Sequence, residues 1–209
     1  RGEKMGQIDF DDKNGLYFQW TPPAQKGAPS FVFFNALTGD HETWEAYIGP
    51  ECRRAGYGTL VFNYRGQTGS PFSPDLRLDD KLIVADTLRL LEVIQPPRAI
   101  LVGLSIGGLF AARVVLEGFQ AAGLVLINTL RRDGHRLKWI GDALVRMAQV
   151  GGLELLRDVY LPLLMNEDWI EASRNSFLAG TGYTGLDPGA GAYKLLAEAG
   201  RLSDWALPY

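Results

Sequence analysis

The sequence predicts an α/β fold whose core is a mostly parallel, doubly wound sheet. Between residues 14 and 128, short apolar runs alternate with longer segments whose apolar residues recur at helical spacing. The runs are continuously apolar, which is typical of strands buried on both faces of a parallel sheet. Strands joined through helices of this length favour right-handed crossovers and parallel pairing. A chain of 209 residues fits one such domain.

The first half of this alternation predicts three strands and two helices. The strands are expected at residues 16–20, 31–34 and 59–62, and the helices at residues 42–54 and 78–94. The earlier helix is interrupted, or begins late, near Gly49 and Pro50. The later helix is amphipathic and is ended by Pro96 and Pro97.

The second half predicts two more strands and then a change of pattern. Strands are expected at residues 98–102 and 123–127, with a helix at residues 109–116 between them. After residue 131 only helical segments follow, at residues 137–150, 153–165, 169–178 and 190–202. We therefore expect a core at residues 1–130 and a helical cap at residues 131–205, inserted after a sheet strand.

Residues 103–108 read Gly-Leu-Ser-Ile-Gly-Gly and predict a nucleophile elbow. An apolar strand precedes this run and an apolar helix follows it, as the elbow requires. In an elbow the serine sits on a strained turn, and small neighbours let strand and helix approach each other. The free N–H groups at the start of the helix then lie beside the hydroxyl. The alternative is that Ser105 only caps the helix.

Composition excludes several other kinds of protein. The net charge of −3 shows no basic excess, so we expect no nucleic-acid partner. No apolar run reaches the roughly 20 residues of a membrane span. The single cysteine, Cys52, fits a reducing compartment, and a cytoplasmic location is the expectation. No His, Asp or Glu cluster has metal-ligand spacing, and residues 103–108 lack a phosphate-loop lysine, so we expect no metal and no cofactor.

Together these residues resemble the α/β-hydrolase fold family. Ser105 matches the family nucleophile, and residues 35–39 (Asn-Ala-Leu-Thr-Gly) stand where most members have His-Gly. Residues 63–70 resemble the family's Asp-x-Arg-Gly-x-Gly-x-Ser loop, with Asn63 and the pair Gln67-Thr68 as departures. The elbow, residues 35–37 and the pair Asn128-Thr129 are also similar to 3-oxoadipate enol-lactonase-like members, which suggests a small ester or lactone substrate.

The resemblance implies a role for each candidate site residue. Ser105 is the nucleophile, and the backbone N–H groups of Leu37 and Ile106 form the oxyanion hole. Asn35 is a possible substrate contact, or it holds its loop by side-chain hydrogen bonds. Trp139 is a possible substrate contact from the cap, whose apolar side chains would line an apolar pocket if some of them face Ser105.

The catalytic base and acid are not evident. Of the two histidines, His41 precedes Ser105 and is expected to be solvated or to face the substrate, whereas His135 stands at the entrance to the cap. The family's acid and histidine follow its later strands, and Asp133 is explained by surface ion pairing. We expect the last strands, with both groups, to lie beyond Tyr209 on a longer or separate polypeptide. The sheet edge left unpaired would invite a companion segment or a second copy.

These observations predict a serine hydrolase of the esterase kind, which cleaves a small ester, lactone or thioester through Ser105. Basic residues at the cap entrance either pair with a substrate carboxylate or form a solvated turn; they are Arg131, Arg132 and Arg136. The alternative function is a non-catalytic protein that binds a small ligand on a hydrolase scaffold, with Ser105 as an ordinary capping residue.

Overall fold

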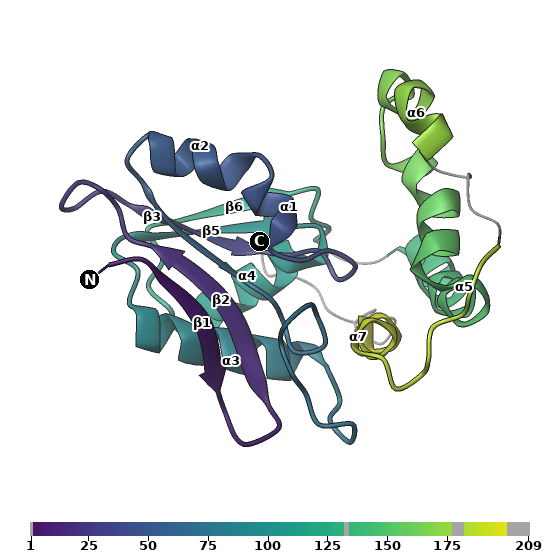
Figure 1. The fold of residues 1–209 in the computed structure, drawn as a ribbon, viewed down its shortest axis with the longest axis horizontal. Coiled ribbons are helices and arrows are strands. Elements are labelled where there is room, and N and C mark those ends of the chain that lie inside the picture. Colours follow the sequence, from purple (N-terminus) through teal and green to yellow (C-terminus); the bar gives the residue numbers. More distant parts are fainter. Residues whose placement is uncertain (1, 132–133, 177–181, 200–209) are drawn as a thin grey trace.

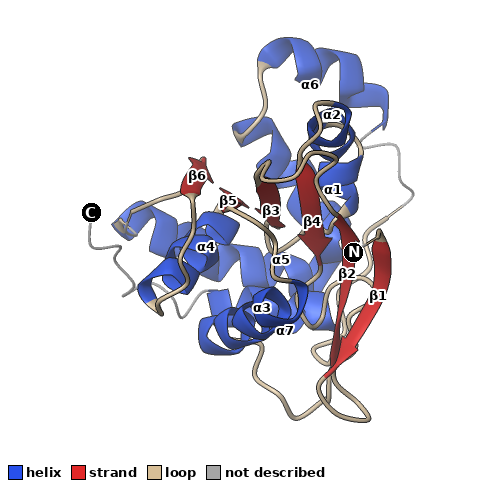
Figure 2. Cartoon of the chain, turned by 90° about the vertical axis from the view of Figure 1, so that its left-hand side faces the viewer, coloured by secondary structure: helices blue, strands red, loops and turns tan. Residues whose placement is uncertain are grey.

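A six-stranded sheet forms the centre of the computed structural model, which describes residues 2–131, 134–176 and 182–199 (Figure 1). In spatial order the strands are β1 (Lys4–Asp9), β2 (Gly15–Thr21), β4 (Gly58–Phe62), β3 (Ser30–Phe34), β5 (Ala99–Leu104) and β6 (Gly123–Ile127). The four strands from β4 to β6 run parallel, whereas β2 runs antiparallel to both of its neighbours, β1 and β4. Figure 2 shows this order from β6 to β1 across the view. The predicted fold class, α/β with a mostly parallel sheet, is confirmed.

Helices cover both faces of the sheet. Helices α3 (Asp80–Ile94) and α4 (Ile106–Leu116) pack on one face, where the larger apolar core includes Phe34, Leu101 and Phe110. The short helices α1 (Glu42–Glu45) and α2 (Ile48–Arg54) lie on the other face with a smaller core. Strand residues point to the two faces alternately, so neighbours such as Phe33 and Phe34 enter different cores.

Two elements differ from the sequence-based expectation. Strand β1 was not predicted, because most of its residues are exposed, half of them are polar, and within the described residues it pairs with β2 alone. The helix expected at residues 42–54 is two helices, and its break lies at Ala46 and Tyr47, ahead of Gly49 and Pro50. Pro50 is accommodated in the first turn of α2, where its missing N–H leaves no hydrogen bond unmade.

Only helices follow β6 in the described part of the chain. They are α5 (His135–Tyr160), η1 (Leu161–Leu163), α6 (Glu167–Ser173), η2 (Arg174–Ser176) and α7 (Gly191–Ala199). Helix α5 is kinked at Gly152, whose φ is +69°, so the two expected segments follow each other without a loop. Of the helices described, none is long and apolar enough to cross a membrane. The domain division at residue 130 stays a prediction.

Helix α7 connects α5 to the core. Leu195 of α7 is buried in the larger core, whereas Leu196 packs with Ala148 and Leu156 of α5. At the start of α7, a Cβ on Gly191 would lie 2.2 Å from the carbonyl oxygen of Gly66. This close approach seats α7 directly on the loop that follows β4.

Candidate active site

Ser105 lies between the end of β5 and the start of α4, with its side chain exposed. Its φ is +55° and its ψ is −124°, a conformation that favours glycine. A non-glycine residue held there stores strain of about 1–3 kcal/mol. The surrounding backbone maintains it: the Ser105 N–H donates to the Ile127 carbonyl at 2.8 Å, and the Thr129 hydroxyl donates to the Ser105 carbonyl at 2.9 Å.

Ser105 differs from the ordinary helix caps of this chain. Asp79 and Asn166, which precede α3 and α6, are extended, and their side chains accept from the backbone N–H groups of Leu82 and Trp169. The Ser105 side chain makes no such cap hydrogen bond. The turn therefore presents the hydroxyl to solvent instead of using it to begin the helix.

The three glycines of the elbow each permit a different close approach. A Cβ on Gly103 would lie 2.3 Å from the Cα of Gly108, where β5 meets α4. On Gly107 it would lie 2.5 Å from the carbonyl oxygens of Phe34 and Asn35. On Gly108 it would lie 2.0 Å from the Thr129 hydroxyl. All three distances are too short for real Cβ contacts, so the small residues are a geometric requirement.

The loop after β3 lies beside the elbow. Strands β3 and β5 are adjacent and parallel, with Phe34 opposite Gly103, so residues 35–39 and Ser105 leave the sheet at the same edge. Within the described residues, the N–H groups of Leu37 and Ile106 donate to no protein oxygen. Both expected oxyanion donors are thus available at the edge where Ser105 stands.

Asn35 is the first residue of this loop and is 1% exposed. Its Nδ2 donates to the Phe62 carbonyl at 2.8 Å, and its Oδ1 accepts from the indole N–H of Trp44 at 2.9 Å. Its amide is therefore engaged inside the protein. The position supports the loop-holding role and not the direct substrate contact expected as an alternative.

Gln67 is a residue of the site that sequence reasoning noted only as a departure from the family pattern. Its Oε1 accepts from the N–H of Tyr64 at 2.9 Å and from Nδ2 of Asn35 at 3.0 Å. Its Nε2 donates to the carbonyl of Ala36 at 3.0 Å. The clue in the sequence was that amide side chains stand together in these two loops, at Asn35, Asn63 and Gln67.

Neither histidine contacts Ser105 by a hydrogen bond within the described residues. His41 is 8% exposed, which corrects the expectation of a solvated side chain. Its Nδ1 lies 3.0 Å from Nδ2 of Asn63, and its ring packs against Tyr17 at 4.9 Å between centroids. His135 is exposed at the first residue of α5. Asp133, the other titratable residue considered there, lies outside the described residues.

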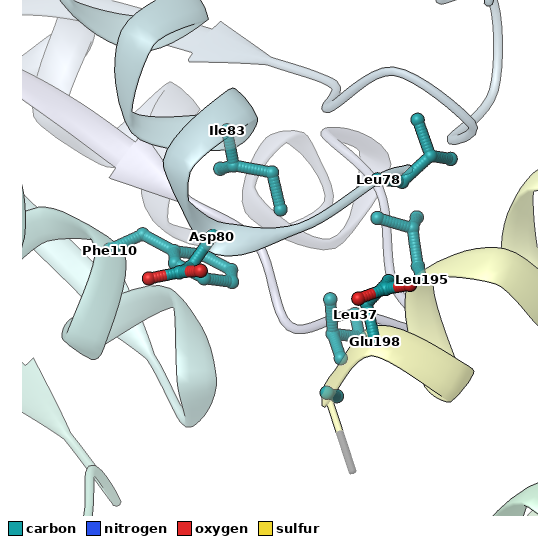
Figure 3. Close-up of a pocket in the computed structure, with 8 residues that line it drawn as sticks. Leu37, Leu78, Asp80, Ile83, Phe110, Leu195 and Glu198 are labelled. Carbon is teal, nitrogen blue, oxygen red and sulfur yellow. The ribbon is translucent and has the colours of Figure 1, made fainter. Parts of the chain in front are cut away.

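A shallow depression, partly open to solvent and too tight to enclose a water molecule, adjoins Leu37 of the oxyanion loop (Figure 3). Leu37, Phe110 and Leu195 contribute apolar walls, and the carboxylates of Asp80 and Glu198 also line it. Trp139 is on α5, with 80% of its surface exposed. Its contact with a substrate remains a prediction. No group of three potential metal ligands occurs in residues 2–131, 134–176 and 182–199.

Comparisons with known proteins agree with this geometry. An esterase from Thermogutta terrifontis is 19% identical with a TM-score of 0.72, over 96% of this chain and 74% of its own. An esterase from Exiguobacterium antarcticum is 15% identical with a TM-score of 0.71, and the match covers 99% of this chain and 75% of the esterase. An enol-lactonase from Burkholderia xenovorans is 21% identical with a TM-score of 0.67, and the match covers 92% of this chain and 71% of the lactonase.

These likenesses show the fold, and the family follows from the sequence. A search of curated proteins gave no match. Residues 31–208 match the sequence profile described as the alpha/beta hydrolase family, a span that includes the oxyanion loop, the elbow and all the described helices after β6. The resemblance drawn from the elbow and its neighbouring loops is confirmed: the chain belongs to the alpha/beta hydrolase family.

Proposed function

We propose that this protein is a serine hydrolase that cleaves a small ester, lactone or thioester by acyl transfer through Ser105. The observation that carries the proposal is the conformation of Ser105, with a φ of +55° and no cap hydrogen bond from its side chain. A capping serine would be extended and bonded, as Asp79 and Asn166 are. Strain at an exposed hydroxyl favours a nucleophile, because backbone strain concentrates at functional sites.

In this mechanism the Ser105 hydroxyl oxygen attacks the acyl carbonyl while a base takes its proton. The carbonyl oxygen becomes an oxyanion, which accepts hydrogen bonds from the N–H groups of Leu37 and Ile106. The loss of one such donor costs about 3–4 kcal/mol of transition-state stabilisation. The alcohol or thiol part leaves with a proton, and water then attacks the acyl group on Ser105 to release the acid.

We assign the base and its acid partner to groups outside the described residues, because neither His41 nor His135 bonds to Ser105. Strand β6 supports this assignment. It pairs only with β5 in the described sheet, and Leu124, Val125 and Ile127 remain 39%, 43% and 36% exposed. A further strand along β6, from a companion segment or a second copy, would cover these side chains and end beside the Ile127–Ser105 hydrogen bond.

The choice of substrate class rests on the depression beside Leu37 and on the structural neighbours. Apolar walls beside Leu37 favour a hydrocarbon portion on the substrate. The structural neighbours include proteins named as esterases and an enol-lactonase, which is in keeping with small esters and lactones. We also propose a cytoplasmic location, on the single and half-buried Cys52.

Steady-state hydrolysis of aryl esters with acyl chains of increasing length tests the proposal. We expect turnover of short acyl esters by the purified protein and background rates for Ser105→Ala. The matched control is Ser173→Ala, which changes a serine in α6, outside the proposed site. Equal rates for the protein and Ser105→Ala would overturn the proposal. Binding of an ester without hydrolysis would instead favour the non-catalytic ligand-binding protein.

A further inference from the structure

We propose that Gln67 is a positioning residue that aims the N–H of Leu37 at the oxyanion. The proposal rests on the hydrolase function proposed above and explains how this chain builds its oxyanion hole without the His-Gly pair. Gln67 is 8% exposed and lies in the loop after β4, below residues 35–39.

The peptide between Ala36 and Leu37 determines where the proposed donor points. The Ala36 carbonyl and the Leu37 N–H belong to one planar trans peptide, so they point in opposite directions. The Nε2 of Gln67 donates to the Ala36 carbonyl at 3.0 Å and approaches the Leu37 carbonyl at 3.3 Å. The Ala36 carbonyl also accepts from the Gly39 N–H at 3.2 Å. By holding this carbonyl on the inner side, Gln67 keeps the Leu37 N–H turned outward to the edge where Ser105 stands.

The hydrogen-bond partners determine which end of the Gln67 amide faces the loop. The backbone N–H of Tyr64 can only donate, and it donates to Oε1 of Gln67 at 2.9 Å. The Nδ2 of Asn35 donates to the same oxygen at 3.0 Å. Asn35 is itself oriented by the indole N–H of Trp44, which also can only donate. Nε2 of Gln67 is therefore left to face the carbonyls of the loop.

This position requires an acceptor on one side and a donor on the other. A carboxylate could accept from Tyr64 and Asn35, but it has no proton to give to the Ala36 carbonyl. Two carbonyl-type oxygens would then face each other in a buried site, and the peptide would rotate to separate them. A protonated carboxyl group has both functions again. The Gln67→Glu variant thus converts the proposed positioning into a pH-dependent property.

We would measure kcat and KM for a short acyl ester, and the rate of Ser105 labelling by a fluorophosphonate, across pH for the purified protein and Gln67→Glu. At neutral pH we expect kcat to fall about 10–100-fold with little change in KM, part of the loss seen when an oxyanion donor is removed. As the pH falls and the new carboxyl group takes up a proton, the ratio of variant to unmodified rates should return toward one.

The controls separate positioning from general effects. Gln120→Glu makes the same change where a side-chain amide donates to the exposed Gly118 carbonyl, and should leave rates unchanged. Gln67→Met, which cannot donate at any pH, should show a pH-independent loss. The nearby His41 and Asp40 are present in all variants, so their effects cancel in the ratio.

Each outcome decides between the two proposals. If Ser105 reacts and Gln67→Glu matches the unmodified protein at every pH, the role of Gln67 is wrong and the hydrolase function stands. If Ser105 of the unmodified protein does not react although the segment that supplies the base is present, the hydrolase function fails. Crystal structures of the unmodified protein and of Gln67→Glu then test the geometry alone. If the Ala36–Leu37 peptide of Gln67→Glu is not rotated at a pH above the pKa of the new carboxyl group, the proposed role of Gln67 is overturned.

Discussion

Gly107 in the first turn of α4 packs directly on Asn35 at the start of the oxyanion loop. A Cβ at Gly107 would lie only 2.5 Å from the Asn35 carbonyl oxygen. The Tyr64 hydroxyl donates to that same oxygen at 3.0 Å, so the loop is held from the opposite side by a buried side chain. The contact therefore fixes the separation between the two proposed oxyanion donors, which lie on either side of it.

Gly107→Ala should displace the oxyanion loop. Both carbonyl oxygens that would meet the new methyl group belong to the backbone, so no side-chain rotation relieves the clash. We expect a loss of about 1–3 kcal/mol in the free energy of unfolding, measured by urea denaturation. The control is Gly141→Ala in α5, where a Cβ meets nothing within 4 Å and higher helix propensity should slightly stabilise the protein. Equal effects of the two substitutions would contradict the packing described here.

Ser105→Gly should make the protein more stable than Ser105→Ala does. Alanine keeps the strain of a φ of +55°, whereas glycine adopts this conformation without steric cost. We expect a difference of about 1 kcal/mol between the two variants, reduced by the greater chain entropy of glycine in the unfolded state. Thermal and urea denaturation of the pair would measure it. An alanine variant as stable as the glycine variant would show that the turn is unstrained.

The buried ion pair between Arg65 and Asp86 should be necessary for stability. Arg65 donates to both carboxylate oxygens of Asp86, at 2.6 and 2.5 Å, and lies over the Phe10 ring. Arg65→Met leaves a buried charge without its partner, and we expect a loss of about 3–5 kcal/mol. The double variant Arg65→Met with Asp86→Leu should regain most of it. A double variant no better than the single one would contradict this explanation.

The loss in Arg65→Met should depend on pH in a defined direction. Burial raises the pKa of the Asp86 carboxyl above its ordinary value of 3.8, and the hydrogen bond and charge of Arg65 oppose this rise. A raised pKa in the folded state contributes stability at acid pH that disappears as the pH rises through it. Without Arg65 the pKa rises further, so the deficit of the variant should grow as the pH rises above the ordinary pKa of a carboxyl group. A deficit that shrinks over this range would contradict the assignment.

If a further strand lies along β6, the β6 side chains that are exposed in the described sheet should be sensitive to substitution. Val125→Lys, at a side chain 43% exposed in the described sheet, should then lower stability or abolish labelling of Ser105. The control is Met5→Lys on β1 at the other edge of the sheet, where Met5 is 70% exposed. Denaturation and size-exclusion chromatography would compare the two. If both variants match the unmodified protein, nothing covers β6.

Patterns that depend on local geometry were predictable from the sequence. The apolar runs predicted β2 to β6. In β4 all five residues are buried, as expected of a strand covered on both faces. The elbow was predictable because Gly103, Gly107 and Gly108 each stand where neighbouring atoms lie too close for any side chain. Strand β1 was not predicted, because an exposed antiparallel edge strand has no continuous apolar run.

The polar part of the site was less predictable, because it depends on which buried amide meets which backbone group. Asn35 looked like a substrate contact or a support, and only its hydrogen bonds to Trp44 and Phe62 distinguish the two. The role of Thr129, which donates to the Ser105 carbonyl, joins residues 24 positions apart and leaves no local pattern. Gln67 was visible only as a departure for the same reason.

The most direct test of the central claim is the intact mass of the protein before and after reaction with a fluorophosphonate, with the modified peptide mapped. A nucleophilic Ser105 predicts one adduct on the peptide containing residues 103–108, absent from Ser105→Ala. The mass of the unreacted protein would also show whether a companion segment accompanies the chain. A protein whose mass includes a companion segment and that still forms no adduct, or an adduct that forms equally in Ser105→Ala, would contradict the assignment of Ser105 as the nucleophile.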